Sequence, residues 1–214
     1  MRGAVLALAA MAMPMLASAA TLPPGTYTNE EEVYFETLAK RPAAPWIGIM
    51  VAADGKLSFV DVYGKPVAAT AYKGLLPGNL PNRASLILAD GRVTELRQAR
   101  TATCWGASPK VVKKADGSED WVAARDLKLH DQGGRVRFGG GTTGALEVEL
   151  RMRNVIWPSG TSRPSLVLYV HKPDNFDHAE SYSWADPSAS MIGINLRWMQ
   201  GSCTIDTVSE EKPQ

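Results

Sequence analysis

Cysteine is scarce in this chain, and neither sign of charge is in excess. Two cysteines in 214 residues are too few for a disulfide-stapled scaffold or for a zinc site with four thiolate ligands. The 23 Lys and Arg residues are balanced by 22 Asp and Glu residues. Nucleic-acid-binding proteins normally carry a basic excess, so this balance argues against a nucleic-acid partner.

Sequence motifs typical of catalysis are also missing. The chain has no G-x-S-x-G nucleophile elbow, no G-x-x-x-x-G-K phosphate loop, no H-E-x-x-H zinc helix and no G-x-G-x-x-G that opens a helix. The glycines at 139–141 follow a predicted strand, but another predicted strand comes next, so no helix N-terminus is available for a phosphate. We assign the chain to no family from its sequence.

The first twenty residues have the three parts of a secretory signal peptide. Arg2 supplies a positive charge, residues 4–16 form a short apolar run, and residues 17–19 read Ala-Ser-Ala. The run contains Pro14 and is shorter than the ~20 residues that span a bilayer, so we interpret residues 1–20 as a cleaved leader. No later segment is apolar enough to cross a membrane. We therefore predict export, to the periplasm or the exterior.

Export changes the interpretation of the two cysteines. In an oxidising compartment Cys104 and Cys203 are each other's only partners, and a disulfide is favoured there. The bond would close a loop of about 100 residues, a constraint of about 4–5 kcal/mol in the chain-entropy model. We predict a Cys104–Cys203 disulfide.

One helix and many short strands are predicted for the remainder. Asn29 and Glu32 have the spacing of a capping box, and Pro42 stops a helix, which predicts a helix over about 29–41. Further along, Asp-Gly pairs at 54–55, 90–91 and 116–117 separate apolar segments and predict three hairpins. The glycine- and proline-rich segment 63–82 predicts a long loop.

These patterns predict a mainly β fold, an antiparallel sandwich or barrel of about ten short strands with one N-terminal helix. We expect one β-rich globular domain over 21–206, followed by a flexible charged tail over 207–214.

Two charged, alternating segments predict a specific strand pairing. If Arg137 lies opposite Glu147, then Arg135 lies opposite Glu149, and the alternating Val136 and its apolar neighbours face the other way. This register predicts a solvent-exposed face of paired charges and a buried apolar face.

A polar segment at 171–180 is the candidate metal site. His171, Asp174, Asp177 and His178 include residue types that bind zinc, iron or calcium, and they lie within eight positions of one another. Their spacing matches no known metal motif, and Asp, Asn and Pro are ordinary turn formers, which favours a polar connection. We therefore expect no cofactor and keep a metal at 171–180 as the alternative.

The six tryptophans are scattered, and most suit a wide β core. Trp157 and Trp184 lie near predicted loops, so we expect these two to be exposed and to contact a ligand.

Together these features favour an exported, non-catalytic β-rich binding or accessory module for a small molecule, a glycan or a protein. Two alternatives remain. One is an envelope hydrolase or metal-dependent enzyme that uses the 171–180 loop. The other is a protein-partner module, such as an inhibitor or adhesion domain, that displays the 63–82 loop.

Overall fold

A computed structural model of the chain describes residues 22–80, 82–156 and 163–206. The predicted signal peptide at 1–20, Trp157 and the predicted tail at 207–214 lie outside these residues. The described part is 54% strand and 7% helical, with fourteen strands in three antiparallel sheets and a single α-helix near the N-terminus. The predicted mainly β antiparallel fold is confirmed, with fourteen strands instead of about ten.

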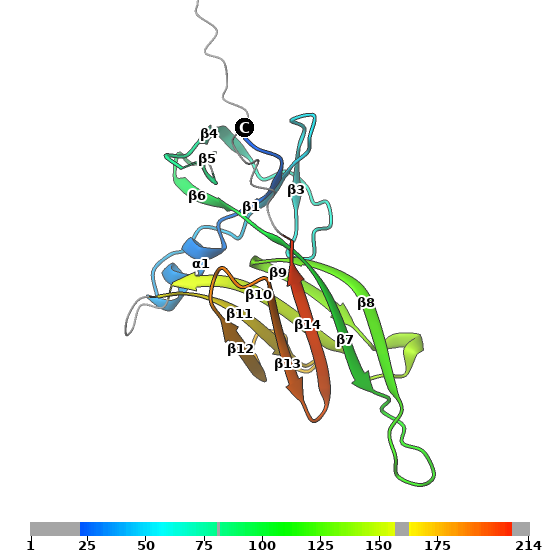
Figure 1. Cartoon of the computed structure of the whole chain (residues 1–214). Helices are drawn as coiled ribbons and strands as arrows, with labels where there is room; N and C mark the ends of the chain where they lie inside the picture. Colours follow the sequence, from blue (N-terminus) through cyan, green and yellow to red (C-terminus); the bar gives the residue numbers. More distant parts are fainter. Residues whose placement is uncertain (1–21, 81, 157–162, 207–214) are drawn as a thin grey trace, which may run out of the picture.

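The N-terminal lobe, residues 22–98, is built around a curled six-stranded sheet (Figure 1). The strands are β1 (Gly25–Thr28), β2 (Gly48–Val51), β3 (Leu57–Val60), β4 (Tyr72–Pro77), β5 (Arg83–Leu88) and β6 (Val93–Gln98), in spatial order β3-β2-β1-β6-β5-β4. Its two edge strands approach each other, since the rings of Phe59 in β3 and Tyr72 in β4 have centroids 5.7 Å apart. The sheet encloses a core of Tyr27, Ile47, Ile49, Val51, Phe59, Ala84, Leu86, Leu88 and Leu96.

Strand β4 corrects the prediction of a long loop over 63–82. Leu75 and Leu76 of this strand pair with Leu86 and Ser85 of β5. The sequence concealed the strand because its glycine falls at an irregularity of the pairing and its proline falls at the strand's end. Proline is tolerated at such a position because β4 lies at a sheet edge.

The C-terminal lobe, residues 99–206, is a sandwich of two four-stranded antiparallel sheets (Figure 1). One sheet, in the order β12-β11-β10-β9, consists of β9 (Gln132–Phe138), β10 (Val148–Ile156), β11 (Pro164–His171) and β12 (Ser181–Ala185). The other, in the order β13-β14-β7-β8, consists of β7 (Thr101–Pro109), β8 (Trp121–His130), β13 (Met191–Leu196) and β14 (Met199–Ile205).

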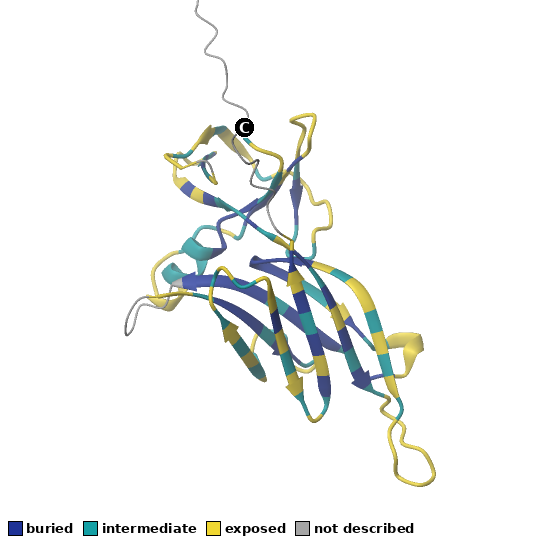
Figure 2. Cartoon of the chain, in the orientation of Figure 1, coloured by how far each residue is buried: buried dark blue, intermediate teal, exposed yellow. Residues whose placement is uncertain are grey.

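The facing sides of these two sheets form one core, visible as dark blue bands along the strands (Figure 2). Its buried residues are Ala102, Cys104, Leu129, Phe138, Val148, Leu150, Met152, Leu166, Leu168, Val170, Ile192, Met199, Cys203 and Ile205. The described residues thus hold two hydrophobic cores, one in each lobe, and the single domain over 21–206 stays a prediction.

All three Asp-Gly pairs form the predicted hairpin turns, which join β2 to β3, β5 to β6 and β7 to β8. In each turn the aspartate accepts a backbone hydrogen bond from the residue two positions later, at 2.9–3.0 Å. The glycines have φ of +80°, +90° and +80°, a left-handed conformation that glycine adopts without steric cost.

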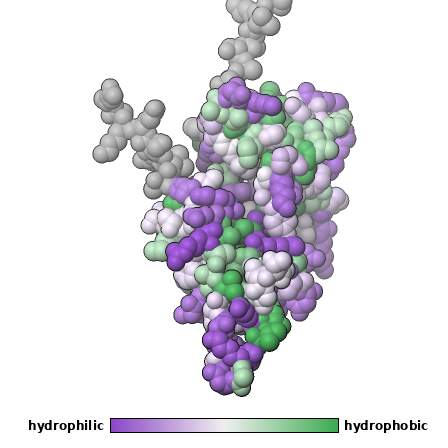
Figure 3. Space-filling model, turned by 90° about the vertical axis from the view of Figure 1, so that its right-hand side faces the viewer, coloured by the Kyte–Doolittle hydropathy of each residue, from purple (hydrophilic) through white to green (hydrophobic). Residues whose placement is uncertain are grey.

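The β7–β8 hairpin projects from one end of the sandwich (Figure 1). Val111 and Val112 lie beyond β7 and are exposed beside Lys113 and Lys114. The lower end of the side view accordingly mixes strongly hydrophobic and strongly hydrophilic residues (Figure 3).

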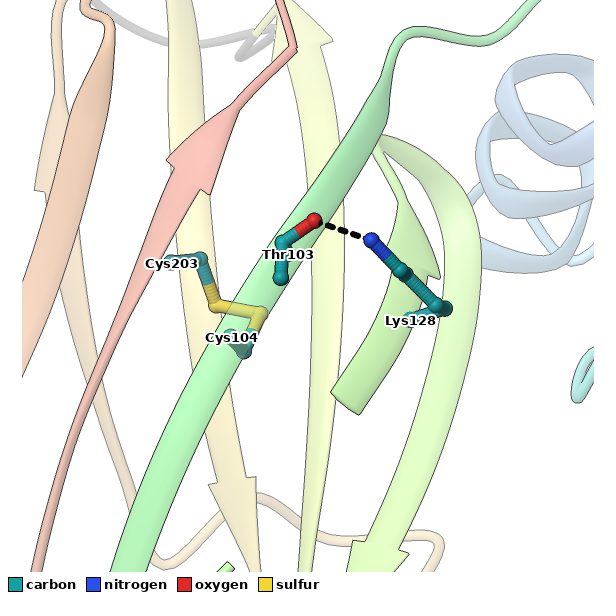
Figure 4. Close-up of a disulfide and its surroundings, with 4 residues drawn as sticks. All are labelled: Thr103, Cys104, Lys128 and Cys203. Carbon is teal, nitrogen blue, oxygen red and sulfur yellow. Dashed lines mark hydrogen bonds between the residues drawn. A yellow bond between two sulfur atoms is a disulfide. The ribbon is translucent and has the colours of Figure 1, made fainter. Parts of the chain in front are cut away.

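The predicted disulfide is present. Cys104 of β7 and Cys203 of β14 are directly paired across the two strands, with Cα atoms 3.9 Å apart, and both are buried in the sandwich core. Next to it, on the outer side of β7, the ammonium of Lys128 donates a 2.5 Å hydrogen bond to the hydroxyl of Thr103 (Figure 4). The disulfide joins two strands whose cysteines are 99 positions apart in sequence.

The single α-helix, α1 (Glu30–Leu38), is shorter than the predicted 29–41. Asn29 does not cap it, because its side chain instead donates to the carbonyl of Pro45 and accepts from the amide of Ile47. The hydroxyl of Thr28 accepts a 3.3 Å hydrogen bond from the amide of Glu30 in its place. None of the helices in the described part of the chain has the length and apolarity that crossing a bilayer requires.

The prediction that these two segments form an antiparallel strand pair is confirmed, but the predicted register is wrong. Strands β9 and β10 pair antiparallel, but Arg137 lies opposite Glu149, and Phe138 opposite Val148, a shift of two positions. A shift of two keeps every side chain on its predicted face, so Phe138 and Val148 are buried as expected. The shift also places both arginines within reach of Glu149.

Candidate functional site

The four residues of the candidate metal site are not brought together. His171 ends β11 and is buried, whereas Asp174, Asp177 and His178 are exposed in the turn that follows. The turn is built on Asn175, whose side-chain oxygen accepts hydrogen bonds from the two backbone amides at 177 and 178. Across the described ranges, no group of three or more His, Cys, Asp or Glu side chains is placed to hold a metal ion.

The outer face of the β9–β12 sheet is covered around Glu149 on β9 and β10, and this corrects the prediction of a solvent-exposed charged face there. Glu149 has no exposed side-chain surface, and Arg135 is only 16% exposed. The covering groups are Tyr63, which comes from the N-terminal lobe, and Phe176, which comes from the 171–180 turn. The ring of Phe176 lies 3.7 Å from the Arg137 guanidinium.

Three hydrogen bonds converge on the carboxylate of Glu149. Arg135 donates at 2.5 Å, Arg137 at 2.7 Å and the hydroxyl of Tyr63 at 2.7 Å. Burial alone would raise the pKa of Glu149, but these donors outweigh it and hold the pKa below its usual value. For Tyr63, burial first and then the bond to Glu149 raise the pKa.

A second carboxylate is held in the same way. Glu30, the first residue of α1, is buried between Arg151, which donates a hydrogen bond to it, and Arg153, whose Nε lies 2.8 Å from its Oε1. The Arg153 guanidinium also lies 3.6 Å from the centre of the Tyr34 ring. Glu30 therefore anchors the helix to the other lobe.

These charged groups form the joint between the lobes and are poorly suited to acid–base catalysis. Glu149 and Glu30 are each occupied by two arginines, so neither is free to exchange a proton with a substrate. His171 lies on the same face, opposite Glu149. Burial first, and then the neighbouring Arg135, lower the pKa of His171, which leaves the imidazole neutral at pH 7.

Among the described residues, the most exposed aromatic side chains lie on β12, at the edge of the β9–β12 sheet. Trp184 is 73% exposed and Tyr182 is 59% exposed, and both point away from the sandwich core. Tyr182 is paired with Tyr169 of β11, and their ring centroids are 6.1 Å apart. We call Tyr169, Tyr182 and Trp184 the aromatic edge. The predicted exposure of Trp184 is confirmed, although it lies within a strand.

Sequence reasoning missed two further exposed tryptophans. Trp105 and Trp121, on β7 and β8, are each 40% exposed on the outer face of the other sheet. The exposure of Trp105 could have been predicted from strand alternation. Its neighbour Cys104 points into the core, and successive residues of a strand face opposite sides.

Comparison with family models, with curated proteins and with solved structures finds no match to this chain.

Proposed function

We propose that this chain is an exported, non-catalytic binding module that contacts a glycan through the aromatic edge. The exposure of Trp184 and Tyr182 carries the proposal, because two aromatic side chains exposed on the same face of one strand form a surface on which a ligand can stack. Export is supported by the leader-like residues 1–20 and by the Cys104–Cys203 disulfide, which persists in oxidising compartments.

The size of the edge favours a glycan over a protein partner. A Tyr or Trp side chain buries about 150–250 Å² when fully covered, so Trp184 and Tyr182, which are 73% and 59% exposed, supply roughly 200–330 Å². A stable protein interface buries about 800 Å² on each partner. Sugar rings present flat C–H faces that stack on aromatic rings, and their hydroxyls can bond to the Tyr182 hydroxyl at the rim.

Affinity electrophoresis tests the ligand class. The protein is run through native gels containing soluble β-glucan, xylan, glycogen or glycol chitin, and we expect at least one polysaccharide to retard it. Trp184→Ala should weaken that retardation about tenfold. Trp121→Ala, which removes an exposed tryptophan from a different sheet, should leave it unchanged. The ligand class is wrong if no polysaccharide retards the protein, or if both variants bind equally.

Expression of the full chain in a bacterial host tests export separately. We expect the protein in the periplasm or medium, with its N-terminus at Ala20 or Thr21. An uncleaved chain retained in the cytoplasm would contradict this part of the proposal.

A further inference from the structure

We infer that the N-terminal lobe has a separate site for a zwitterionic ligand, a short peptide bound through its charged ends. The site is a groove of about 390 Å³ between helix α1 and strands β5 and β6. It adjoins a second hollow of about 320 Å³ beside the β4–β5 turn, and both are lined by Arg83 and Glu95. This site is independent of the aromatic edge, which lies on the other lobe.

Two arginines provide the cationic wall of the groove. Arg83 of β5 and Arg97 of β6 are cross-strand partners, so their side chains leave the sheet side by side. Each lies 3.6–3.7 Å from the Glu31 carboxylate, and Arg83 lies 3.6 Å from Glu95. These separations exceed the usual hydrogen-bond distance, so the charges are compensated while the directed guanidinium donors stay available within the described structure. A guanidinium group recognises a carboxylate through two parallel hydrogen bonds, so either arginine can bind a ligand carboxylate.

The glutamates of the groove differ in how far they are already engaged. Glu32 accepts hydrogen bonds from the Thr94 hydroxyl at 2.9 Å and from the Glu95 amide at 3.0 Å, so it holds the helix against β6. The Glu95 side chain is 70% exposed, and its ion-pair partner Arg83 lies 3.6 Å from the carboxylate. That carboxylate is available to accept hydrogen bonds from a ligand ammonium group.

The balance of charge selects the ligand class. The lining has two arginines and three glutamates, so a plain anion such as phosphate meets a net negative wall. A molecule with one carboxylate and one ammonium group satisfies both sets of side chains at once. Phe35 of α1 adds an apolar surface, and the adjoining hollow reaches Leu80, which gives room for the side chains of a short peptide.

Isothermal titration calorimetry with the dipeptide Ala-Leu tests the inference on the mature protein. We expect Ala-Leu to bind, and N-acetylation or C-amidation of the dipeptide to weaken binding at least tenfold. Arg97→Gln should also weaken it at least tenfold. Arg92→Gln, in the turn between the same two strands and paired only with Asp90, should change it less than twofold.

Glu95→Gln provides a second variant that does not depend on a buried contact, and it should weaken Ala-Leu binding without changing the melting temperature. The site assignment is overturned if intact protein does not bind Ala-Leu, if inorganic phosphate binds as tightly, or if Glu95→Gln binds normally. Trp184→Ala should bind Ala-Leu like the parent protein, so failure of the glycan proposal and failure of this one are distinguishable.

Discussion

The hydroxyl of Tyr63 donates a 2.7 Å hydrogen bond to the carboxylate of Glu149, which joins residues 86 positions apart and on different lobes. Glu149 is fully buried and also accepts hydrogen bonds from Arg135 and Arg137. This one side chain of β10 therefore connects the N-terminal lobe to strands β9 and β10 of the sandwich. This connection makes the stability of the protein sensitive to that carboxylate.

We expect Glu149→Ala to lower the free energy of unfolding by about 3–5 kcal/mol, because it leaves the covered guanidinium of Arg135 without its partner and removes the partner of Arg137. Glu147→Ala provides the control, since Glu147 forms no ion pair with another described residue, and it should cost less than 1 kcal/mol. Urea unfolding measures both. Equal losses for the two variants would favour the register predicted from the sequence over the register of the structure.

Acidification should destabilise the protein through His130. Burial lowers the pKa of this imidazole below 6.5, and the nearby Asp131 and Glu30 raise it only in part. Its Nδ1 accepts the amide of Gln132 at 3.3 Å, which requires that nitrogen to be unprotonated. Below about pH 6.5 His130 therefore binds a proton more readily in the unfolded chain than in the folded chain. The free energy of unfolding consequently falls as the pH drops below about 6.5.

His130→Asn should reduce the stability loss between pH 6.5 and pH 5, because its amide oxygen can replace Nδ1 as the acceptor and does not titrate. The buried His171, whose pKa is also lowered, accounts for a remaining part of the loss. Urea midpoints measured at half-unit intervals give the slope. The same slope in the variant and the parent would show that His130 binds its proton equally in the folded and unfolded states, so that burial does not lower its pKa.

Removal of the disulfide by the double substitution Cys104→Ala and Cys203→Ala should lower the free energy of unfolding by about 4 kcal/mol. The reason is that the unfolded chain gains conformational entropy when the loop is no longer closed. For a chain of this length the melting temperature should fall by roughly 10 °C. The oxidised parent should not react with iodoacetamide when denatured without reductant, because neither cysteine is free. Alkylation at either cysteine would contradict the assigned bond.

Val148→Asp should prevent stable folding, because Val148 has no exposed surface and the new carboxylate would enter the sandwich core without a partner. Val93→Asp is the matched control on an exposed strand position and should change stability by about 0.5 kcal/mol or less. Yields of soluble protein and circular dichroism spectra distinguish the two outcomes.

Local signals in the sequence were sufficient for the hairpins and insufficient for the joint between lobes. An Asp-Gly turn depends on a few adjacent residues, so Asp54, Asp90 and Asp116 could be interpreted without knowledge of the fold. The pairing of Arg137 was misjudged because charge alternation permits registers that differ by two residues. In the register of the structure Glu149 bonds to Tyr63, a distant residue that no local pattern connects to it.

The same reasoning explains the mixed result for the candidate sites. Exposure of Trp184 was expected because it lies near a predicted loop, and the residue is exposed in the structure. The groove at Arg83 and Arg97 was not found, because it requires knowing that β5, β6 and the helix meet. The candidate metal residues were close in sequence, but the direction of each side chain, rather than sequence proximity, determines whether ligands converge.

The position of the disulfide also determines how the protein responds to mechanical force. Cys104 lies in the first strand of the sandwich and Cys203 in the last, so a tension applied between the two ends of the chain passes from one strand to the other through a covalent bond. The segment between the cysteines carries none of that load. A stretched molecule therefore extends through its N-terminal lobe while the sandwich remains folded.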